Sequence, residues 1–175
     1  MRYFGNFKDW IKDEWVEFSI SQTGIHPSIY EGTKTWKIWM DDGWTKELIN
    51  NNVFNRENFP YNIEFPMIVD GYEKITPGDY DWNICRYRPG EFVPFHIDEL
   101  DYPYIKFWMP LQDYEDGHIF LYKGELIKDY KKGDFFLFDG YEPHAAGNLG
   151  NRPRSVLIID IFGGLMESFK KQYLE

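Results

Sequence analysis

The chain has 175 residues, a length that fits one domain, since compact domains usually span about 100–200 residues. Its net charge of −10 and pI near 4.9 disfavour a nucleic-acid partner, because a phosphate-binding surface needs clustered Lys and Arg. The single cysteine, Cys85, excludes an internal disulfide. The chain shows neither a signal-peptide pattern nor about 18 consecutive apolar residues, so we expect a soluble, cytoplasmic protein without a membrane span.

The first 81 residues are expected to form helices and strands that support a more regular second part. Apolar residues recur at helical spacing between Phe7 and Phe18, which predicts an amphipathic helix. The turn-forming residues 21–32 predict a loop that contains His26, and residues 35–40, TWKIWM, predict a strand. The Asp-Asp-Gly at 41–43 predicts a turn before a short helix.

The rest of this first part is expected to be a loop followed by a strand. Residues 50–61 are rich in asparagine and contain a proline, as loops often do. Residues Asn62–Val69 are predicted to form a strand. Turns are expected at Asp70–Gly71 and at Thr76–Asp79, where glycine and proline are typical turn formers.

From Trp82 to Phe162 the chain is a series of short apolar or alternating runs separated by turn signals. The runs are WNICRY, EFVPFHID, YIKFWMPL, GHIFLY, GELIKDY, DFFLF and RSVLIIDIF. Such regular short strands predict a mainly β fold, a double-stranded β-helix (jelly roll, cupin-like). Residues 163–175 are expected to form a C-terminal helix, with Leu165, Met166, Phe169 and Tyr173 on its apolar side.

Three residues within this β region have the chemistry of a metal site. His96 and Asp98 are two positions apart in a predicted strand, so their side chains point to the same face. His144 follows the run DFFLFDG. Two histidines and one carboxylate are the ligand set of non-haem iron(II) oxygenases, which leaves open positions on the metal. The His-x-Asp pattern alone is a weak signal, because three residues recur by chance.

Arg154 adds a possible anion site. It follows His144 by ten residues (154 − 144) and opens the run RSVLIIDIF, where it shares a predicted face with Val156, Ile158 and Asp160. A guanidinium keeps its charge and binds a carboxylate with two parallel hydrogen bonds. Arg152 is the alternative for this role, although its spacing of eight from His144 fits less well.

The order His-x-Asp, distal His, then Arg in the final strand resembles the Fe(II)- and 2-oxoglutarate-dependent oxygenases. Within them the chain is most similar to the aspartyl/asparaginyl β-hydroxylase group, which includes free-proline hydroxylases. The similarity is carried by YIKFWMPLQD, YKKGDFFLFDGYEPHAAGN and RPRSVLIIDIF. It implies that His96, Asp98 and His144 bind iron, and that Arg154 binds the distal carboxylate of 2-oxoglutarate.

Two more positions follow from this resemblance. Tyr87 matches a tyrosine that prolyl-4-hydroxylase-like members place against 2-oxoglutarate. Lys106 lies where the group often has an arginine that faces the co-substrate, and an ammonium cannot reproduce the fork of a guanidinium. Asp98 is a second difference, since some animal β-hydroxylases lack this carboxylate; its presence shifts the comparison towards bacterial free-amino-acid hydroxylases.

The sequence leaves the roles of four further residues open. His118 could line the pocket, but pairing with a neighbour or exposure at the surface is the stronger expectation. Asp160 could orient the site, bind substrate or end its strand with a surface hydrogen bond. Cys85 is expected to be a small buried apolar residue, and Trp108 to belong to the core or the pocket wall.

The resemblance implies one oxygenase domain (1–175) with a supporting part (1–81), a jelly-roll core (82–162) and a C-terminal helix (163–175). It implies Fe(II), 2-oxoglutarate and O2 as metal and co-substrates, and hydroxylation of an unactivated carbon of an amino acid or peptidyl side chain. The alternatives are a non-catalytic cupin-like metal- or ligand-binding module, or an oxygenase acting on another small molecule or a nucleic acid. The oligomeric state does not follow from the sequence.

Overall fold

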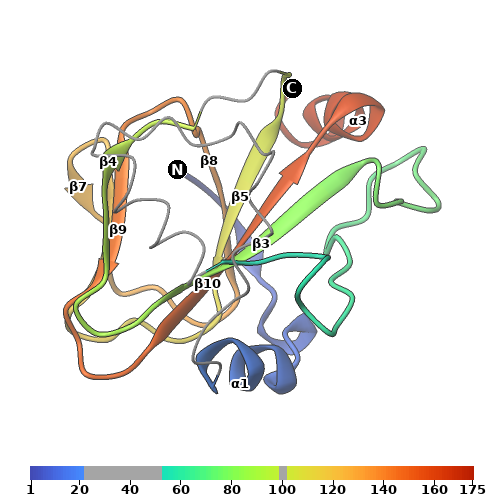
Figure 1. The fold of residues 1–175 in the computed structure, drawn as a ribbon. Coiled ribbons are helices and arrows are strands. Elements are labelled where there is room, and N and C mark those ends of the chain that lie inside the picture. The colour runs from blue at the N-terminus through green and yellow to red at the C-terminus, as the bar shows by residue number, and fades with distance from the viewer. Residues whose placement is uncertain (22–52, 99–101) are drawn as a thin grey trace.

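Two antiparallel β-sheets face each other in the computed structural model, which describes residues 1–21, 53–98 and 102–175. The expected mainly β, cupin-like jelly roll is confirmed. The larger sheet has six strands in the order β1 (Arg2–Asn6), β8 (Asp134–Phe138), β5 (Ile105–Pro110), β10 (Arg154–Ile161), β3 (Tyr80–Tyr87) and β2 (Val53–Phe54). The smaller sheet has four strands in the order β4 (Phe92–His96), β9 (His144–Asn148), β6 (His118–Tyr122) and β7 (Glu125–Leu126). Figure 1 shows β4 and β9 as one layer beside β3, β5 and β10.

The larger sheet is buried on both faces, which explains why its central strands read as nearly continuous apolar runs. In β10, Leu157, Ile159 and Ile161 point to the outer face, whereas Arg154, Val156, Ile158 and Asp160 lie on the opposite, inner face. The outer face packs against α1 (Asp13–Ser21) and α3 (Gly163–Tyr173) through Trp15, Leu165, Met166 and Phe169. The inner face packs against the smaller sheet through a second apolar cluster that includes Tyr87, Trp108, Phe120, Tyr130 and Phe138.

The terminal helices follow the predicted pattern with one change. The C-terminal helix α3 is confirmed and buries Leu165, Met166 and Phe169. The predicted single helix over Phe7–Phe18 is instead a short 3-10 helix, η1 (Lys8–Trp10), followed by α1. In the described part of the chain, no helix is long and apolar enough to cross a membrane.

The predicted strand Asn62–Val69 is wrong. This segment forms no strand, although Ile63, Phe65 and Val69 are buried in the outer cluster. Its apolar pattern reflects packing of side chains. The Ile63 carbonyl accepts a hydrogen bond from the Tyr80 hydroxyl of β3 at 2.8 Å, and not from the backbone of a neighbouring strand that the structure describes. The turns at Asp70–Gly71 and Thr76–Asp79 are confirmed.

The other differences concern short strands. Val53–Phe54 forms β2 within the predicted loop 50–61, and the run GELIKDY contributes only the two residues of β7. His144–Asn148 forms the central strand β9, which was not predicted as a strand. Ser21, the first residue of the expected loop 21–32, is instead the last residue of α1. The rest of that loop with His26, the expected strand at 35–40 and the turn and helix from residue 41 lie outside the described residues.

Candidate metal centre and pocket

His96 and His144 face each other across the smaller sheet. They are the last residue of β4 and the first of β9, and the register of these antiparallel strands pairs them directly. Both side chains are buried, and their ring centroids lie 4.3 Å apart. Pairing of two rigid strands therefore fixes the separation of two potential metal ligands that are 48 positions (144 − 96) apart in the sequence.

Each imidazole is oriented by its own backbone. His96 Nδ1 lies 2.8 Å from the Pro94 carbonyl oxygen, and His144 Nδ1 lies 2.9 Å from the Glu142 carbonyl oxygen. A carbonyl can only accept, so in the neutral form of each imidazole Nδ1 is the nitrogen that carries the proton and Nε2 has the lone pair. Burial lowers the pKa of His144, although the Asp98 carboxylate opposes this. This arrangement is typical of histidines that bind metals through Nε2.

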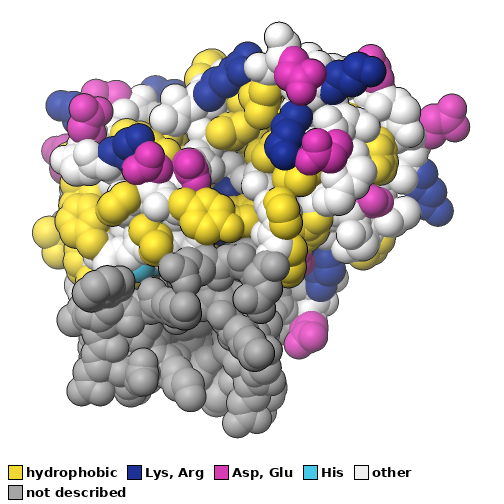
Figure 2. All heavy atoms as spheres, turned by 90° about the horizontal axis from the view of Figure 1, so that it is seen from above, with side chains coloured by type: hydrophobic (Ala, Val, Ile, Leu, Met, Phe, Trp, Pro, Cys, Tyr) yellow, Lys and Arg dark blue, Asp and Glu magenta, His cyan; other side chains and the backbone are white. Residues whose placement is uncertain are grey.

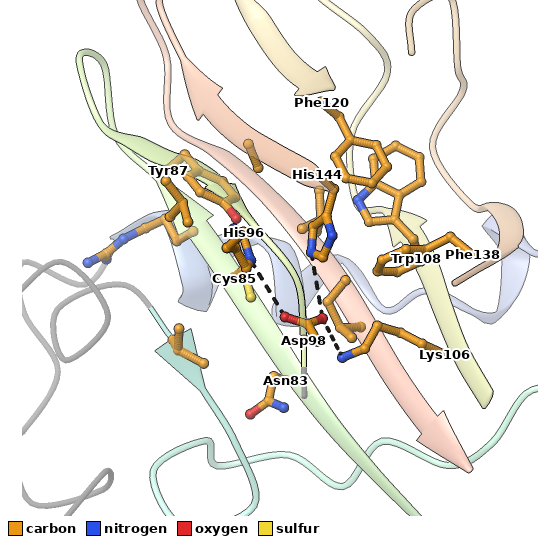
Figure 3. Close-up of a pocket in the computed structure, with 16 residues that line it drawn as sticks. Asn83, Cys85, Tyr87, His96, Asp98, Lys106, Trp108, Phe120, Phe138 and His144 are labelled. Carbon is orange, nitrogen blue, oxygen red and sulfur yellow. Dashed lines mark ion pairs between the residues drawn. The ribbon is translucent and has the colours of Figure 1, made fainter. Parts of the chain in front are cut away.

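Asp98 completes the cluster from just beyond the end of β4. Its backbone N–H donates to the Gly140 carbonyl at 2.7 Å, and its carbonyl accepts from the Tyr104 hydroxyl at 3.0 Å. Its carboxylate Oδ1 lies 3.5 Å from His96 Nε2, and Oδ2 lies 3.6 Å from His144 Nε2 (Figure 3). Ligand atoms of all three residues fall within 4.8 Å of one another, as one metal ion requires.

Lys106 lies on the other side of Asp98, in β5. Its Nζ is 3.1 Å from Asp98 Oδ2, 3.1 Å from Asp160 Oδ1 and 3.2 Å from Asp160 Oδ2. Burial alone would raise the pKa of Asp98, but the Lys106 ammonium and the two imidazoles outweigh it and hold that pKa below its usual value. Burial raises the pKa of Asp160 to about 6, against the influence of Lys106. Asp160 is buried beside the cluster. The interpretation of Asp160 as a surface residue at the end of its strand is therefore wrong.

A pocket of about 780 Å³, open solvent included, joins these residues. It is lined by His96, Asp98 and His144, by the predicted co-substrate residues Tyr87 and Lys106, and by apolar or small side chains that include Cys85, Trp108, Phe120, Phe138 and Val156. Trp108 is thus a wall residue. Figure 2 shows one face of the molecule, where hydrophobic side chains and a histidine lie next to the residues that are not described.

Arg154 lies next to this pocket but does not line it. Its guanidinium carbon is 5.5 Å from the ring centroid of Tyr87 and 5.9 Å from that of Trp108, both of which are wall residues. Nη1 donates to the backbone carbonyls of Ile119 at 2.6 Å and Gly147 at 3.1 Å. Nε and Nη2 are buried and have no hydrogen-bond partner among the described residues. A buried cation with open donors is suited to an anionic ligand.

The other candidates lie outside the pocket lining. Arg152 is exposed and pairs with Glu115 at 2.5 Å, so of the two candidate arginines Arg154 is the buried one. His118 is buried against Tyr130, with its Nδ1 3.2 Å from the tyrosine hydroxyl, which confirms the pairing interpretation. Burial, followed by the nearby Arg154 charge, lowers the pKa of His118 to about 4.

Sequence reasoning gave no role to Asn148, which builds the turn between His144 and Arg154. It is fully buried at the end of β9. Its Nδ2 donates to the carbonyls of Tyr87 at 2.9 Å and Arg152 at 2.6 Å, and its Oδ1 accepts from the Gly150 N–H at 2.8 Å. An asparagine directly before a Gly-containing turn was the available signal.

Comparison with protein families identifies the family of the chain. The family model described as aspartyl/asparaginyl beta-hydroxylase matches residues 9–163, which is most of the chain. The chain belongs to the aspartyl/asparaginyl β-hydroxylase family. The match includes every residue of the cluster and Arg154. A search of curated proteins gave no match.

Similar solved structures are cupin-type proteins. A cupin 2 conserved barrel domain protein from Salinispora arenicola is 12% identical, with 79% of this chain and 98% of that chain covered and a TM-score of 0.42. A cupin protein from Bacteroides fragilis is 17% identical, with 49% and 68% covered and a TM-score of 0.38. A predicted oxalate decarboxylase from Thermotoga maritima is 22% identical with a TM-score of 0.37; the match covers 47% of this chain and 66% of that one, just under two thirds of its length.

Proposed function

We propose that this protein is an Fe(II)- and 2-oxoglutarate-dependent dioxygenase that hydroxylates an unactivated carbon of an amino acid or peptidyl side chain. The observation that carries the proposal is the buried cluster of His96, Asp98 and His144 in a chain of the β-hydroxylase family. Two imidazoles and one carboxylate are the facial ligand set of non-haem iron, and they leave coordination positions for other ligands.

The residues around the cluster fit the metal. Both Nδ1 atoms lie against backbone carbonyls, so each histidine turns its Nε2 towards Asp98. Asp98 Oδ1 is buried without a hydrogen-bond partner among the described residues, although it is an anionic oxygen. Burial raises the pKa of the nearby Cys85 thiol to about 12, so this residue stays protonated and does not compete as a thiolate ligand.

The residues around Arg154 fit a dicarboxylate such as 2-oxoglutarate. The open Nε and Nη2 donors are the groups that a carboxylate accepts from. Val156 and Ile158 continue the same face of β10 from Arg154 into the pocket, which provides an apolar bed for the carbon chain between the two ends. Burial raises the pKa of Tyr87, so its hydroxyl stays neutral and can donate a hydrogen bond.

Bound iron, 2-oxoglutarate and dioxygen would supply the oxidant that inserts one oxygen atom into a C–H bond, with succinate and CO2 as co-products. The chain's own residues hold the ligands and keep water out. Trp108, Phe120 and Phe138 form an aromatic wall beside His144, and such a dry wall limits side reactions. The net charge of −10 supports a small-molecule or peptide substrate over a nucleic acid.

The test is turnover of 2-oxoglutarate. Protein loaded anaerobically with Fe(II) is mixed with 2-oxoglutarate and air, and succinate is measured with and without a panel of free amino acids and short peptides. We expect succinate that depends on iron and increases with a matching substrate, and none from His144→Ala. Metal binding by the wild-type protein without succinate under any of these conditions would instead favour a non-catalytic cupin-like binding module.

A further inference from the structure

Lys106 is held between two carboxylates on neighbouring strands. The register of β5 and β10 pairs Lys106 directly with Asp160, and all three side chains are at least nine-tenths buried. The ammonium has three protons, and the three oxygens within 3.2 Å of Nζ are both oxygens of Asp160 and Oδ2 of Asp98. Nζ donates a hydrogen bond to Asp160 Oδ2 and forms ion pairs with Asp98 Oδ2 and Asp160 Oδ1, and Asp160 Oδ1 has no hydrogen-bond partner among the described residues. The ammonium is therefore held by the two carboxylates of this group.

The two oxygens of Asp98 are consequently not equivalent. Oδ2 is engaged by Lys106, whereas Oδ1 has no hydrogen-bond partner in the described part of the chain and lies 3.5 Å from His96 Nε2. Figure 3 shows the carboxylate between Lys106 on one side and the two imidazoles on the other. A carboxylate that is held through one oxygen can offer the other oxygen as a single metal ligand. A group that holds a ligand side chain in this way orients it towards the metal.

We propose that Lys106 and Asp160 act as a positioning pair that fixes Asp98 as a one-oxygen metal ligand. The proposal depends on the proposed metal site and deepens it. In this arrangement Lys106 fixes Oδ2, and Asp160 keeps the ammonium from pairing fully with Asp98. The pair also balances charge, since an ammonium buried with a single carboxylate would compete with the metal for that carboxylate.

This role differs from the one implied by family resemblance, in which the residue at position 106 faces the co-substrate. Lys106 does line the pocket, but both oxygens of Asp160 and one oxygen of Asp98 already surround its Nζ. A ligand carboxylate at Lys106 would have to displace one of these anions. The contacts of Lys106 therefore favour an action on Asp98 over direct recognition of a ligand.

The test uses Mn²⁺ alone, measured by titration of the free-ion EPR signal in the absence of 2-oxoglutarate. The variants are Lys106→Met, Asp160→Asn and their combination. Lys170→Met is the matched control, because Lys170 forms an exposed ion pair with Glu167 on α3, away from the cluster. Thermal unfolding without metal checks that each variant is folded. If Lys106→Met does not fold, Asp160→Asn still tests the pair, because asparagine has nearly the same size as aspartate.

We expect Lys106→Met and Asp160→Asn each to weaken Mn²⁺ binding by about 10–100-fold, as loss of a residue that orients a metal ligand does. The double variant should bind no more weakly than Lys106→Met, because Asp160 acts through Lys106. If Lys106 acted only through its charge, Lys106→Met would instead strengthen Mn²⁺ binding, since the substitution removes an ammonium that repels the dication.

Unchanged or tighter binding by Lys106→Met would overturn the positioning role, as would unchanged binding by Asp160→Asn or effects of the two substitutions that multiply in the double variant. None of these results would contradict the proposed metal site itself. Absence of Mn²⁺ binding by the wild-type protein would overturn the metal site, and the positioning role with it.

Discussion

Arg154 lies directly opposite Tyr87 in the ladder between β10 and β3, with its guanidinium carbon 5.5 Å from the centroid of the tyrosine ring. Two of its nitrogens, Nε and Nη2, have no hydrogen-bond partner among the described residues although they are buried. The Arg154 guanidinium thus places a positive charge at the edge of an apolar pocket. The first two predictions concern this charge.

The first prediction concerns co-substrate affinity. Arg154→Met should weaken 2-oxoglutarate binding to the metal-loaded protein by at least about 30-fold, because loss of one partner of a buried, hydrogen-bonded charge pair costs about 2–5 kcal/mol. Affinity for the metal alone should stay within about threefold. Anaerobic calorimetry measures both, with Arg152→Met as the control at an exposed arginine. Equal losses in the two variants, or loss of metal binding in Arg154→Met, would contradict the assignment.

The second prediction concerns stability without ligands. A guanidinium with unmet donors is costly to bury, and replacing buried ionic groups by apolar side chains of similar volume is often neutral or stabilising by about 1–4 kcal/mol. This gain must offset the loss of the two hydrogen bonds that Arg154 donates to the carbonyls of Ile119 and Gly147. Arg154→Met should therefore unfold at the same denaturant concentration as the wild type or at a higher one, when metal and 2-oxoglutarate are absent. Excess 2-oxoglutarate should stabilise only the metal-loaded wild type. Clear destabilisation of the ligand-free variant would show that Arg154 is a structural residue.

The third prediction tests the backbone contact that places Asp98. A Cβ atom at Gly140 would collide with the Tyr104 hydroxyl and approach Asp98 Cβ to 3.1 Å. Gly140→Ala should displace this segment, with a destabilisation of about 1–3 kcal/mol from overpacking and weaker Mn²⁺ binding. Gly78→Ala is the control, because among the described residues a Cβ there meets only the Thr76 hydroxyl, at 3.9 Å. If Gly140→Ala binds Mn²⁺ as the wild type does, the contact is not needed to place Asp98.

The fourth prediction concerns pH. Burial and the Arg154 charge lower the pKa of His118 to about 4 in the folded protein, whereas an unfolded histidine titrates near 6.5. The unfolded chain therefore binds a proton first, and the free energy of unfolding should fall as pH decreases from about 6.5 to about 4. The contribution of His118 is fully present above pH 6.5.

Urea unfolding at several pH values checks this, with His118→Gln as the comparison. The free energy of unfolding of the variant should depend less steeply on pH between about 4 and 6.5 than that of the wild type, because glutamine does not titrate. Parallel curves for the two proteins in this range would show that the pKa of His118 is not lowered by folding.

The ligand cluster could be found from the sequence because its signal lies in the order and type of residues. His96, Asp98 and His144 were singled out as metal ligands, and the structure brings them together. The strand that carries His144 could not be found from propensity, since His-Ala-Ala-Gly-Asn lacks β-branched and aromatic residues. Its small residues are required by packing, because a Cβ on Gly147 would lie 2.9 Å from the Glu91 carbonyl oxygen and 2.5 Å from the Phe92 ring.

Contacts between distant strands were the part that sequence patterns could not provide. The pairing of Lys106 with Asp160 joins residues 54 positions apart and depends on the register of β5 and β10. The burial of Asn62–Val69 without strand pairing shows the same limit. Alternating apolar residues there record which side chains are buried, but they carry no information on whether a neighbouring strand accepts the backbone hydrogen bonds.

The most direct test of the central claim is an anaerobic titration of the metal-free protein with Fe(II) and then with 2-oxoglutarate, followed by visible absorption. Chelation of 2-oxoglutarate to bound iron gives a weak charge-transfer band. We predict that the wild-type protein shows this band and that His96→Ala, which lacks one of the three ligands, does not. Absence of the band from wild-type protein that demonstrably binds Fe(II) would contradict the proposed oxygenase.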